Sequence, residues 1–151
     1  MSYDTQTPYI ASYLLFKNEK GEVAFLKRQN TSWMNGYYSL PSGKVEVDES
    51  FVGAAIREGK EEVGVDVKEQ DLQYVLTVHR NSSEGGNAGM QWIDVFFEVV
   101  NYSGELYNAE PDVHSELEWF DPKNLPDDVI PSLAACLEAW INGEVYFEHG
   151  W

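Results

Sequence analysis

The sequence is poor in cysteine and contains no long apolar run. Its single cysteine, Cys136, excludes an intramolecular disulfide and a cysteine-based zinc cluster. No uninterrupted apolar stretch reaches the ~18–20 residues that a membrane-spanning helix requires. The opening residues MSYDTQTPYI show neither the basic nor the apolar segment of a secretory signal. We therefore expect a protein of a reducing compartment, the cytoplasm.

Basic residues are also scarce. The 151 residues include 26 Asp and Glu but 10 Lys and Arg, which gives a formal net charge of −16. This balance argues against a protein that binds a nucleic-acid polymer or a membrane surface, because both partners require clustered cations. An acidic protein that handles phosphates would need a metal ion between its carboxylates and the ligand.

The residues that are present suffice for one compact domain. A chain of this length lies at the upper end of the most common domain sizes. Hydrophobic residues make up 43% and aromatic residues 14% of the sequence, which is ample for a packed core. No repeat period recurs and no linker divides the chain. We therefore expect a single domain over residues 1–151.

Apolar periodicity predicts more strands than helices. One helix is predicted over residues 50–63, with Gly64 as its left-handed C-terminal cap, and another over 131–141. The first two predicted strands read as a hairpin, and residues 81–89 read as a flexible loop. The predicted strands are 10–16, 23–26, 37–40, 72–80, 91–100 and 116–120. This order suggests an α/β fold with a sheet covered on two faces.

The predicted helix 50–63 carries three carboxylates on one face. At about 100° per residue, Glu61 and Glu62 lie on either side of Glu58. An apolar stripe beside them is expected to be the buried face and comprises Val52, Ile56, Gly59 and Val63. Each like-charged pair costs about 0.2–0.5 kcal/mol when exposed. The three carboxylates therefore form either a solvated acidic face or a site for a hard cation such as Mg²⁺ or Mn²⁺.

Neighbouring residues extend these carboxylates into a longer motif. Gly43 is expected in a tight turn that can direct a backbone carbonyl towards a metal, and Glu49 precedes the helix, where it can orient Arg57. The pattern G-x5-E-x7-R-E-x2-E-E-x-G-[aliphatic] spans residues 43–65. It resembles the Nudix box, and the chain from about residue 9 to 140 is similar to a short, single-domain Nudix hydrolase of the MutT type.

This resemblance implies an α/β/α sandwich, with a mixed β-sheet flanked by helices. It also implies metal-dependent hydrolysis, with Mg²⁺ or Mn²⁺, of a nucleoside diphosphate linked to another group. Glu58 and Glu62 would be the principal metal ligands, with Glu61 a ligand directly or through water and Gly43 a carbonyl donor. The general base would be Glu58 or Glu61. The catalytic set implied by the resemblance is Glu58, Glu61, Arg57 and Glu49.

One position in the box departs from the family pattern. Gly59 stands where the family usually has an aliphatic residue, and the helical wheel places it on the stripe expected to be buried. A close approach of helix and sheet would explain a glycine there. Its cost in helix propensity is up to ~1 kcal/mol.

Four residues besides the fixed positions of the box pattern complete the candidate site. Glu116 resembles the acidic residue that related enzymes bring to the metal from a later loop, but it also reads as a simple carboxylate at the start of a strand. Arg28 and Lys44 are the nearest cations for phosphate oxygens. Asp128 precedes the last helix, where MutT-type enzymes often bind a base. Further contenders are Asp94 as an acidic residue and Trp33, Tyr38, Met90 and Trp92 for base stacking.

The function expected first is a nucleoside triphosphate pyrophosphohydrolase that releases a nucleoside monophosphate and pyrophosphate. An ADP-ribose, sugar-nucleotide or dinucleoside polyphosphate hydrolase is an alternative of the same class. A nucleotide-binding Nudix module without catalysis is a second alternative, although it predicts a degraded carboxylate set, whereas here the set is complete. The expected partner is a small nucleotide, with no nucleic-acid polymer or membrane, and the expected assembly is a monomer or homodimer.

Overall fold

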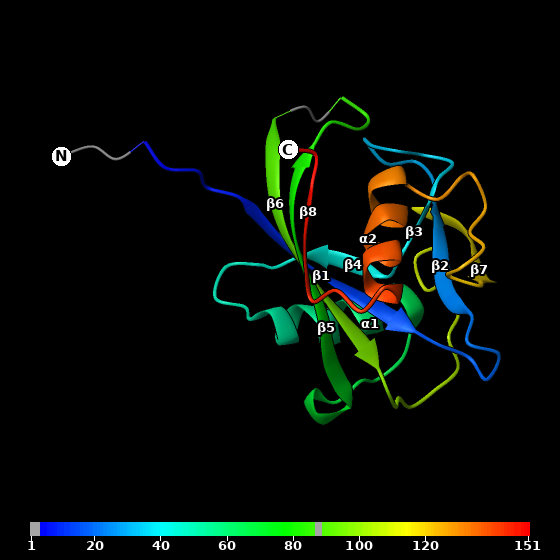
Figure 1. Cartoon of the computed structure of the whole chain (residues 1–151). Coiled ribbons are helices and arrows are strands. Elements are labelled where there is room, and N and C mark those ends of the chain that lie inside the picture. Colours follow the sequence, from blue (N-terminus) through cyan, green and yellow to red (C-terminus); the bar gives the residue numbers. More distant parts are fainter. Residues whose placement is uncertain (1–3, 87–88) are drawn as a thin grey trace.

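The computed structural model describes residues 4–86 and 89–151, in which eight strands, two α-helices and a 3-10 helix are present (Figure 1). Residues 87 and 88 of the predicted loop 81–89 lie outside the described part. The helices are α1 (Phe51–Val63), α2 (Pro131–Ile141) and the 3-10 helix Glu69–Asp71. The strands are β1 (Tyr9–Phe16), β2 (Val23–Arg28), β3 (Tyr38–Ser39), β4 (Ser42–Lys44), β5 (Leu72–Ser82), β6 (Met90–Val99), β7 (His114–Phe120) and β8 (Tyr146–His149).

The strands form a five-stranded mixed sheet and a three-stranded antiparallel sheet. The larger sheet has the order β4-β1-β6-β5-β8, in which β1 runs parallel to β6 and β5 parallel to β8. The pairs β4–β1 and β6–β5 are antiparallel. The smaller sheet has the order β3-β2-β7. The sequence did not predict β4 and β8 as strands, and these two form the edges of the larger sheet.

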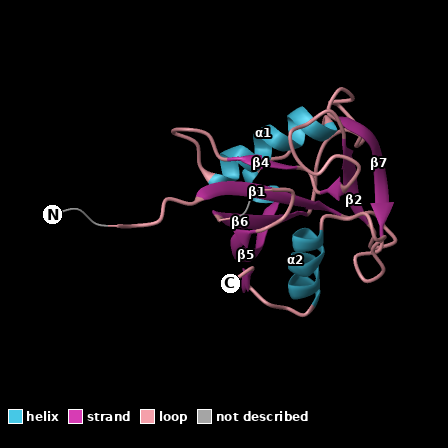
Figure 2. Ribbon diagram, turned by 90° about the horizontal axis from the view of Figure 1, so that it is seen from above, coloured by secondary structure: helices cyan, strands magenta, loops and turns pink. Residues whose placement is uncertain are grey.

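The helices α1 and α2 cover opposite faces of the five-stranded sheet (Figure 2). Side chains of β1 alternate accordingly: Leu14 and Phe16 are buried in the core on the α1 side, whereas Leu15 is buried in the core that contains Leu133 of α2. The fold is an α/β/α sandwich, and the prediction of mixed strands flanked by helices is confirmed. No helix among the described residues is long and apolar enough to cross a membrane.

The predicted hairpin of the first two strands is wrong. In the described part of the chain, β1 and β2 belong to different sheets. An isolated antiparallel bridge pairs Lys17 with Val23, and beyond it β2 leaves β1 and pairs with β3 and β7. The reason is that β2 is buried on both sides. Val23 and Phe25 join the core on the α2 side, whereas Ala24 and Leu26 join the core on the α1 side. The strand β2 therefore closes one end of the sandwich.

The buried face of α1 also differs from the predicted one. Gly59 and Val63 are buried as expected, but Val52 and Ile56 are only partly buried. The buried arc is rotated towards the carboxylates and includes Ala54, Ala55 and Glu58. The small alanine side chains let this face approach β1 and β4, and the Ser12 hydroxyl of β1 donates to the Phe51 carbonyl at 2.7 Å. Glu58 is therefore turned into the fold, whereas Glu61 stays exposed.

Two glycines of α1 are expected to respond in opposite directions to alanine. A methyl group at Gly59 would meet Leu14, Val67 and Phe16 at 3.4–3.9 Å, which is ordinary contact. Gly59→Ala should therefore raise the free energy of unfolding by ~0.5–1 kcal/mol through helix propensity. Gly64 caps the helix at φ +72°, and a methyl group there would overlap the Tyr107 ring. Gly64→Ala should lower the free energy by at least ~1 kcal/mol.

Urea unfolding monitored by circular dichroism measures both values. If Gly59→Ala lowers the free energy of unfolding, the approach of α1 to β1 is tighter than the contact distances imply.

Candidate active site

The carboxylates of α1 lie against strand β4. A methyl group at Gly43 would occupy the position of the Glu58 carboxylate, so the absence of a side chain at Gly43 creates the space for it. The amide of Ser42 donates to Glu62 Oε2 at 2.9 Å. The predicted tight turn at Gly43 is wrong, because residues 42–44 form an extended strand paired with β1. The extended backbone holds Glu58 and Glu62 at the edge of the sheet.

Arg57 links the box carboxylates that surround it. Its Nε and Nη2 donate to the two oxygens of Glu49 at 2.8 and 2.9 Å, so Glu49 orients Arg57 through a bidentate pair. Its Nη1 donates to Glu58 at 2.7 Å and to Glu61 at 3.2 Å. The hydrogen bonds from Arg57 lower the pKa of Glu49 to about 2. One guanidinium therefore partly neutralises three carboxylates.

Glu58 and Glu62 are the box carboxylates whose ionisation is most costly. Glu58 is 9% exposed, and burial raises its pKa to about 7 despite the contact with Arg57. Burial raises the pKa of Glu62 well above its usual range, and the charge of Glu58 raises it further. Two adjacent carboxylates at the edge of one strand are thus costly to ionise without a cation. A divalent cation would remove this cost.

The chemistry of this donor set fits a hard divalent metal ion. Carboxylate oxygens and a backbone carbonyl are the donors that Mg²⁺ and Mn²⁺ prefer. Within residues 4–86 and 89–151, no three carboxylate, imidazole or thiol groups already form a metal-binding cluster. The Arg57 guanidinium lies between Glu58 and Glu61 instead, at the distances given above. The carboxylates of α1 would therefore have to shift slightly from Arg57 to hold an ion.

A further carboxylate near the box, Glu110, was missed by sequence reasoning. Its charge raises the pKa of both Glu58 and Glu62, and burial together with the charge of Glu61 raises its own pKa. The loop that carries it is fixed to α1, because the Ala109 amide donates to the Glu62 carbonyl at 3.0 Å. The sequence offers no periodic signal in this loop that would have identified Glu110.

Two predicted site residues lie together in a different cluster. Glu116 accepts a hydrogen bond from the Tyr38 hydroxyl at 2.8 Å and lies 3.6 Å from Lys27 Nζ. Asp128 lies 3.4 Å from the same ammonium group. The residues that raise the pKa values of Glu58 and Glu62 include Glu110 but neither of these two. In this structure Glu116 and Asp128 thus share the ammonium group of Lys27.

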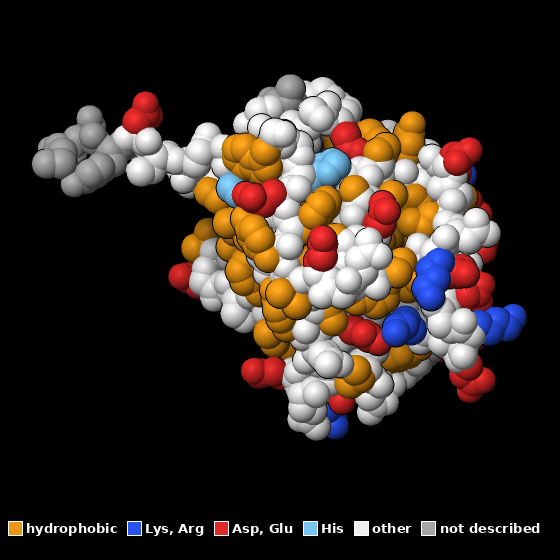
Figure 3. Space-filling view, viewed as in Figure 1, with side chains coloured by type: hydrophobic (Ala, Val, Ile, Leu, Met, Phe, Trp, Pro, Cys, Tyr) orange, Lys and Arg blue, Asp and Glu red, His pale blue; other side chains and the backbone are white. Residues whose placement is uncertain are grey.

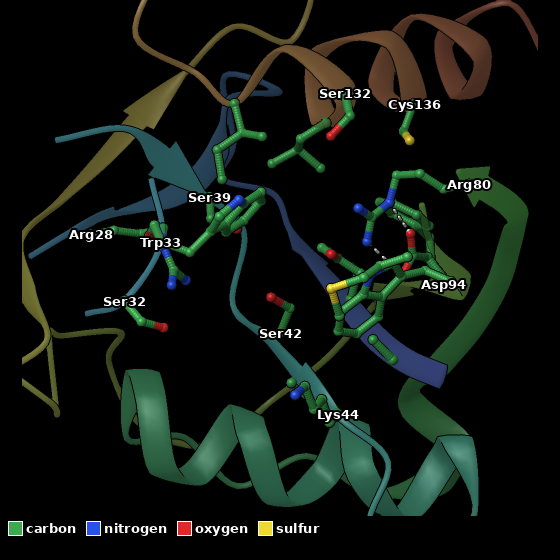
Figure 4. Close-up of a pocket in the computed structure, with 18 residues that line it drawn as sticks. Arg28, Ser32, Trp33, Ser39, Ser42, Lys44, Arg80, Asp94, Ser132 and Cys136 are labelled. Carbon is green, nitrogen blue, oxygen red and sulfur yellow. Dashed lines mark hydrogen bonds and ion pairs between the residues drawn. The ribbon is translucent and has the colours of Figure 1, made fainter. Parts of the chain in front are cut away.

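A cavity of about 520 Å³ opens between the larger sheet and α2 (Figure 4). Its lining includes Ser42 and Gly43, so it adjoins the strand that holds the carboxylates. Two predicted cations, Arg28 and Lys44, line it, as do three of the four predicted stacking residues: Trp33, Met90 and Trp92. Tyr38 is instead buried in the core. The volume is sufficient for a base and a sugar.

Arg28 lies between the cavity and the carboxylates. Its Nε donates to the Trp33 carbonyl at 2.9 Å and its Nη2 to the Thr31 hydroxyl at 3.2 Å, so the side chain is fixed in place. Burial lowers its pKa, while the nearby charge of Glu62 acts in the opposite direction. Arg28 can therefore contact both a bound anion and the acidic site.

Three cations in the cavity contrast with the acidic surface. Asp and Glu side chains are spread over the face on the α2 side, where Lys and Arg gather mainly at one side (Figure 3). The cavity is lined by Arg28, Lys44 and Arg80 but by Asp94 alone among acidic residues. A phosphate ester entering this cavity thus meets a net positive lining in a protein of net charge −16.

Hydrogen bonds connect the loops that carry Trp33 and Glu84 to the start of α2 beside the cavity. The Trp33 indole Nε1 donates to the Glu84 carbonyl at 3.0 Å, and the Ser132 amide at the start of α2 donates to Glu84 Oε2 at 2.8 Å. The N-cap residue Ile130 offers no side-chain acceptor, so Glu84 takes that role. The position of the Trp33 side chain relative to α2 is therefore fixed through Glu84.

Comparison with known proteins identifies the family. A family model for the NUDIX domain matches residues 8–140, so this chain belongs to the Nudix family. It is 32% identical over 105 residues to an ADP-ribose pyrophosphatase of Methanocaldococcus jannaschii, covering 70% of this chain and 57% of that protein. It is also 32% identical over 95 residues to the mRNA-decapping enzyme subunit 2 of Saccharomyces cerevisiae, covering 58% of this chain and 8% of that protein. The chain spans less than two thirds of these curated relatives.

Solved structures agree with this assignment. The crystal structure of a MutT NUDIX hydrolase from Burkholderia pseudomallei superposes with a TM-score of 0.75 at 26% identity, covering 88% of this chain and 98% of that one. A MutT protein from Methanosarcina mazei has the same fold, with a TM-score of 0.75 at 24% identity. The predicted resemblance to MutT-type Nudix proteins is confirmed. Members of this family generally use divalent metal ions and act on small nucleotides.

Glutamine substitutions at the neighbouring residues Glu61 and Glu62 are expected to change the unfolding temperature to different extents. Glu62→Gln removes a partly buried charge and keeps an oxygen for the Ser42 amide, so the metal-free protein should unfold at a higher temperature. A gain of 1 kcal/mol corresponds to about 2–4 °C at this size. Glu61→Gln is the matched control, because its side chain is 50% exposed and should change the midpoint little.

Differential scanning calorimetry in EDTA at pH 8 makes this comparison. A Glu62→Gln protein that unfolds below the parent would contradict the inference that Glu62 is uncompensated.

Proposed function

We propose that this protein is a divalent-metal-dependent pyrophosphohydrolase of nucleoside diphosphate-linked substrates. The specific reaction proposed is hydrolysis of a nucleoside triphosphate to a nucleoside monophosphate and pyrophosphate. The observation that carries the proposal is the pair Glu58 and Glu62, whose charge is only partly compensated, beside a cation-lined cavity large enough for a base and a sugar. The single cysteine, a buried free thiol, accords with a cytoplasmic location.

A metal ion would be held by the oxygens nearest β4. Glu58 and Glu62 would be its principal ligands, with Glu61, Glu110 and the Gly43 carbonyl as additional donors. When bound, the ion, Mg²⁺ or Mn²⁺, neutralises phosphate oxygens and lowers the pKa of a coordinated water. The raised pKa values of Glu58 and Glu62, caused by burial, support this ligand set.

The protein's own residues supply proton transfer and positioning. Glu58 or Glu61 accepts the proton of the attacking water as general base. Glu49 holds Arg57, and Arg57 restrains both candidate bases through its Nη1. Arg28 and Lys44, the last residue of β4, line the cavity and would donate to the phosphate oxygens. The triphosphate would thus extend from the cavity towards α1, with the base at the opposite end.

A second substrate class has a specific observation in its favour. The relative from Methanocaldococcus jannaschii that aligns with 70% of this chain is named an ADP-ribose pyrophosphatase. ADP-ribose carries the same pyrophosphate bridge, so the same residues would act on it. Product analysis separates the two substrates, because a triphosphate releases pyrophosphate whereas ADP-ribose releases AMP and ribose 5-phosphate.

Hydrolysis should depend on a divalent metal and on a triphosphate substrate. The purified protein, incubated with nucleoside triphosphates, ADP-ribose, sugar nucleotides and dinucleoside polyphosphates plus Mg²⁺, should release pyrophosphate from a triphosphate and lose this activity in EDTA. Ion-exchange chromatography identifies the products. Glu62→Gln should lower turnover at least about 10³-fold while the protein remains folded. Cleavage confined to ADP-ribose would contradict the proposed triphosphate substrate. Activity that persists in EDTA would contradict the proposed metal-dependent mechanism.

Two carboxylates outside α1 provide a matched test of the ligand set. Glu110 lies near the box carboxylates, whereas Glu116 is bonded to Tyr38 and Lys27. Glu110→Gln should lower kcat at least about 10²-fold, and Glu116→Gln should lower it less than about threefold. Steady-state kinetics at saturating Mg²⁺ measures both. The reverse order would support Glu116, the residue suggested by the family resemblance, as the ligand from outside the helix.

A further inference from the structure

The two edge strands of the larger sheet, β4 and β8, differ in how their outward backbone groups are used. At β4, the Ser42 amide donates to Glu62 Oε2 at 2.9 Å. The Lys44 carbonyl of the same strand accepts from Arg57 Nη2 at 3.1 Å. Side chains of α1 thus occupy the β4 edge and keep other strands from pairing with it. An edge without such cover presents a row of free donors and acceptors to other chains.

The strand β8 has such a free edge. In its parallel pair with β5, the Thr77 amide donates to the Val145 carbonyl at 3.0 Å, and Thr77 stands opposite Tyr146. In this ladder Phe147 directs its amide and carbonyl towards β5, so those of Tyr146 and Glu148 point away from the sheet. Within the described part of the chain, these outward groups make no hydrogen bond. Four residues of backbone are therefore paired on one side only.

Apolar side chains flank this edge. Val145 is 64%, Tyr146 is 55% and Trp151 is 62% exposed. The Trp151 ring lies 4.7 Å from the ring of His79 on β5, and its indole donates to the His79 carbonyl at 3.1 Å. Exposed apolar side chains thus gather beside the free backbone groups of β8, the red strand in Figure 1. Apolar surface gathered in one place is typical of a contact with another protein.

A second copy of this chain satisfies the free groups of β8 through antiparallel pairing. A twofold axis normal to the sheet keeps α1 on one face and α2 on the other in both copies. Paired residues must then lie on the same face of the joint sheet. In addition, only residues whose backbone groups point outward can exchange hydrogen bonds. Both conditions require Tyr146 to stand opposite an even-numbered residue of the partner subunit.

Strand overlap and charge select one register among these. Placing Glu148 opposite the partner's Glu148 brings like charges together, which is destabilising. Placing Tyr146 opposite the partner's Tyr146 brings Glu148 opposite the partner's Glu144, again a like-charged pair. Larger shifts leave most of β8 unpaired. Placing Tyr146 opposite the partner's Glu148 avoids these contacts and uses every outward group of the strand. In this register Phe147 stands opposite the partner's Phe147, on the twofold axis.

We propose that β8 is the interface of a homodimer, in which two copies pair antiparallel with Phe147 opposite the partner's Phe147. The two five-stranded sheets become one continuous sheet. The exposed side chains of Val145 and Tyr146 then lie against His149 of the partner subunit and Glu148 of the partner subunit. This inference goes beyond the proposed function and does not depend on it, because none of the tests below uses turnover, a metal ion or a nucleotide.

Sedimentation velocity of the parent protein measures the self-association. Each copy carries a net charge of −16 and the paired strands are short, so association should be weak and should strengthen as salt screens the repulsion. In about 0.5 M NaCl, the protein should be mainly dimeric at about 500 µM and mainly monomeric at about 5 µM. A monomer at the higher concentration would overturn the proposal. A dimer that weakens with added salt would also overturn it, because this register contains no ion pair between the copies.

Two substitutions at one position test the outward backbone groups. Glu148→Pro removes an amide that points away from β5, so an edge strand should tolerate it, but pairing with a second copy loses a donor on each side of the axis. This variant should remain monomeric under the conditions in which the parent dimerises. Glu148→Gln is the matched control, because it keeps the amide and removes only the side-chain charge, and it should dimerise at least as well as the parent. Dimerisation of Glu148→Pro equal to that of the parent would contradict the proposal.

Disulfide cross-linking tests the register. Opposite residues of a non-hydrogen-bonded antiparallel pair have Cα atoms about 4.5 Å apart, within the range of a disulfide, so Phe147→Cys should form a covalent dimer under mild oxidation. Val145→Cys is the control, because the register separates it from the partner's position 145 by about 13 Å. The native thiol, Cys136, is buried and should not react.

Cross-linked fractions are read on a non-reducing gel. Val145 is the more exposed of the two positions, so random collisions would favour Val145→Cys. Cross-linking confined to Phe147→Cys supports the proposed pairing. Equal or greater cross-linking of Val145→Cys, or none in Phe147→Cys while the parent dimerises, would overturn it. The sedimentation of the parent decides the question of self-association even if a variant does not fold.

Discussion

The packing of two carboxylates between α1 and β4 is the constraint on which the rest of this structure depends. Glu58 requires the space that Gly43 leaves, and Glu62 requires the amide of Ser42. Both require α1 to lie close to the sheet, which the alanines at 54 and 55 permit. Arg57 is directed by Glu49 and compensates only part of the charge. Folding therefore tolerates an electrostatic cost here, and binding of a cation by the folded protein would recover it.

The same strand that positions the carboxylates also forms a wall of the cavity. Ser42 and Gly43 face a lining in which Arg28, Lys44 and Arg80 are gathered, three of the ten basic residues of the chain. In a strongly acidic protein, such a lining confines the attraction for anions to one place. The polarity of the cavity thus runs from acidic at α1, through the cations beside β4, to the Arg80–Asp94 ion pair near α2.

Features set by neighbouring residues were predictable from the sequence, and features set by distant contacts were not. Gly64 caps α1 as expected, because capping depends on local backbone conformation, whereas Ser50, predicted as the first helical residue, is the N-cap. The box residues were found by their spacing. The hairpin failed because burial of both sides of β2 is decided by the second sheet, and the face of α1 was misjudged because Glu58 is buried against its sequence propensity. Glu110 was missed because its proximity to Glu62 arises from a loop contact 48 residues along the chain.

The alternation of β1 side chains between two cores limits how the length of this strand can change in evolution. Leu14 and Phe16 serve the core beneath the carboxylates, while Tyr13 and Leu15 serve the cavity and the core beneath α2. Insertion of one residue into this strand would exchange the two sets and place each side chain in the wrong layer. Length variation among descendants of this sequence should therefore fall in the loops or occur in the strand by two residues at a time. The strand can drift in composition much more freely than in length.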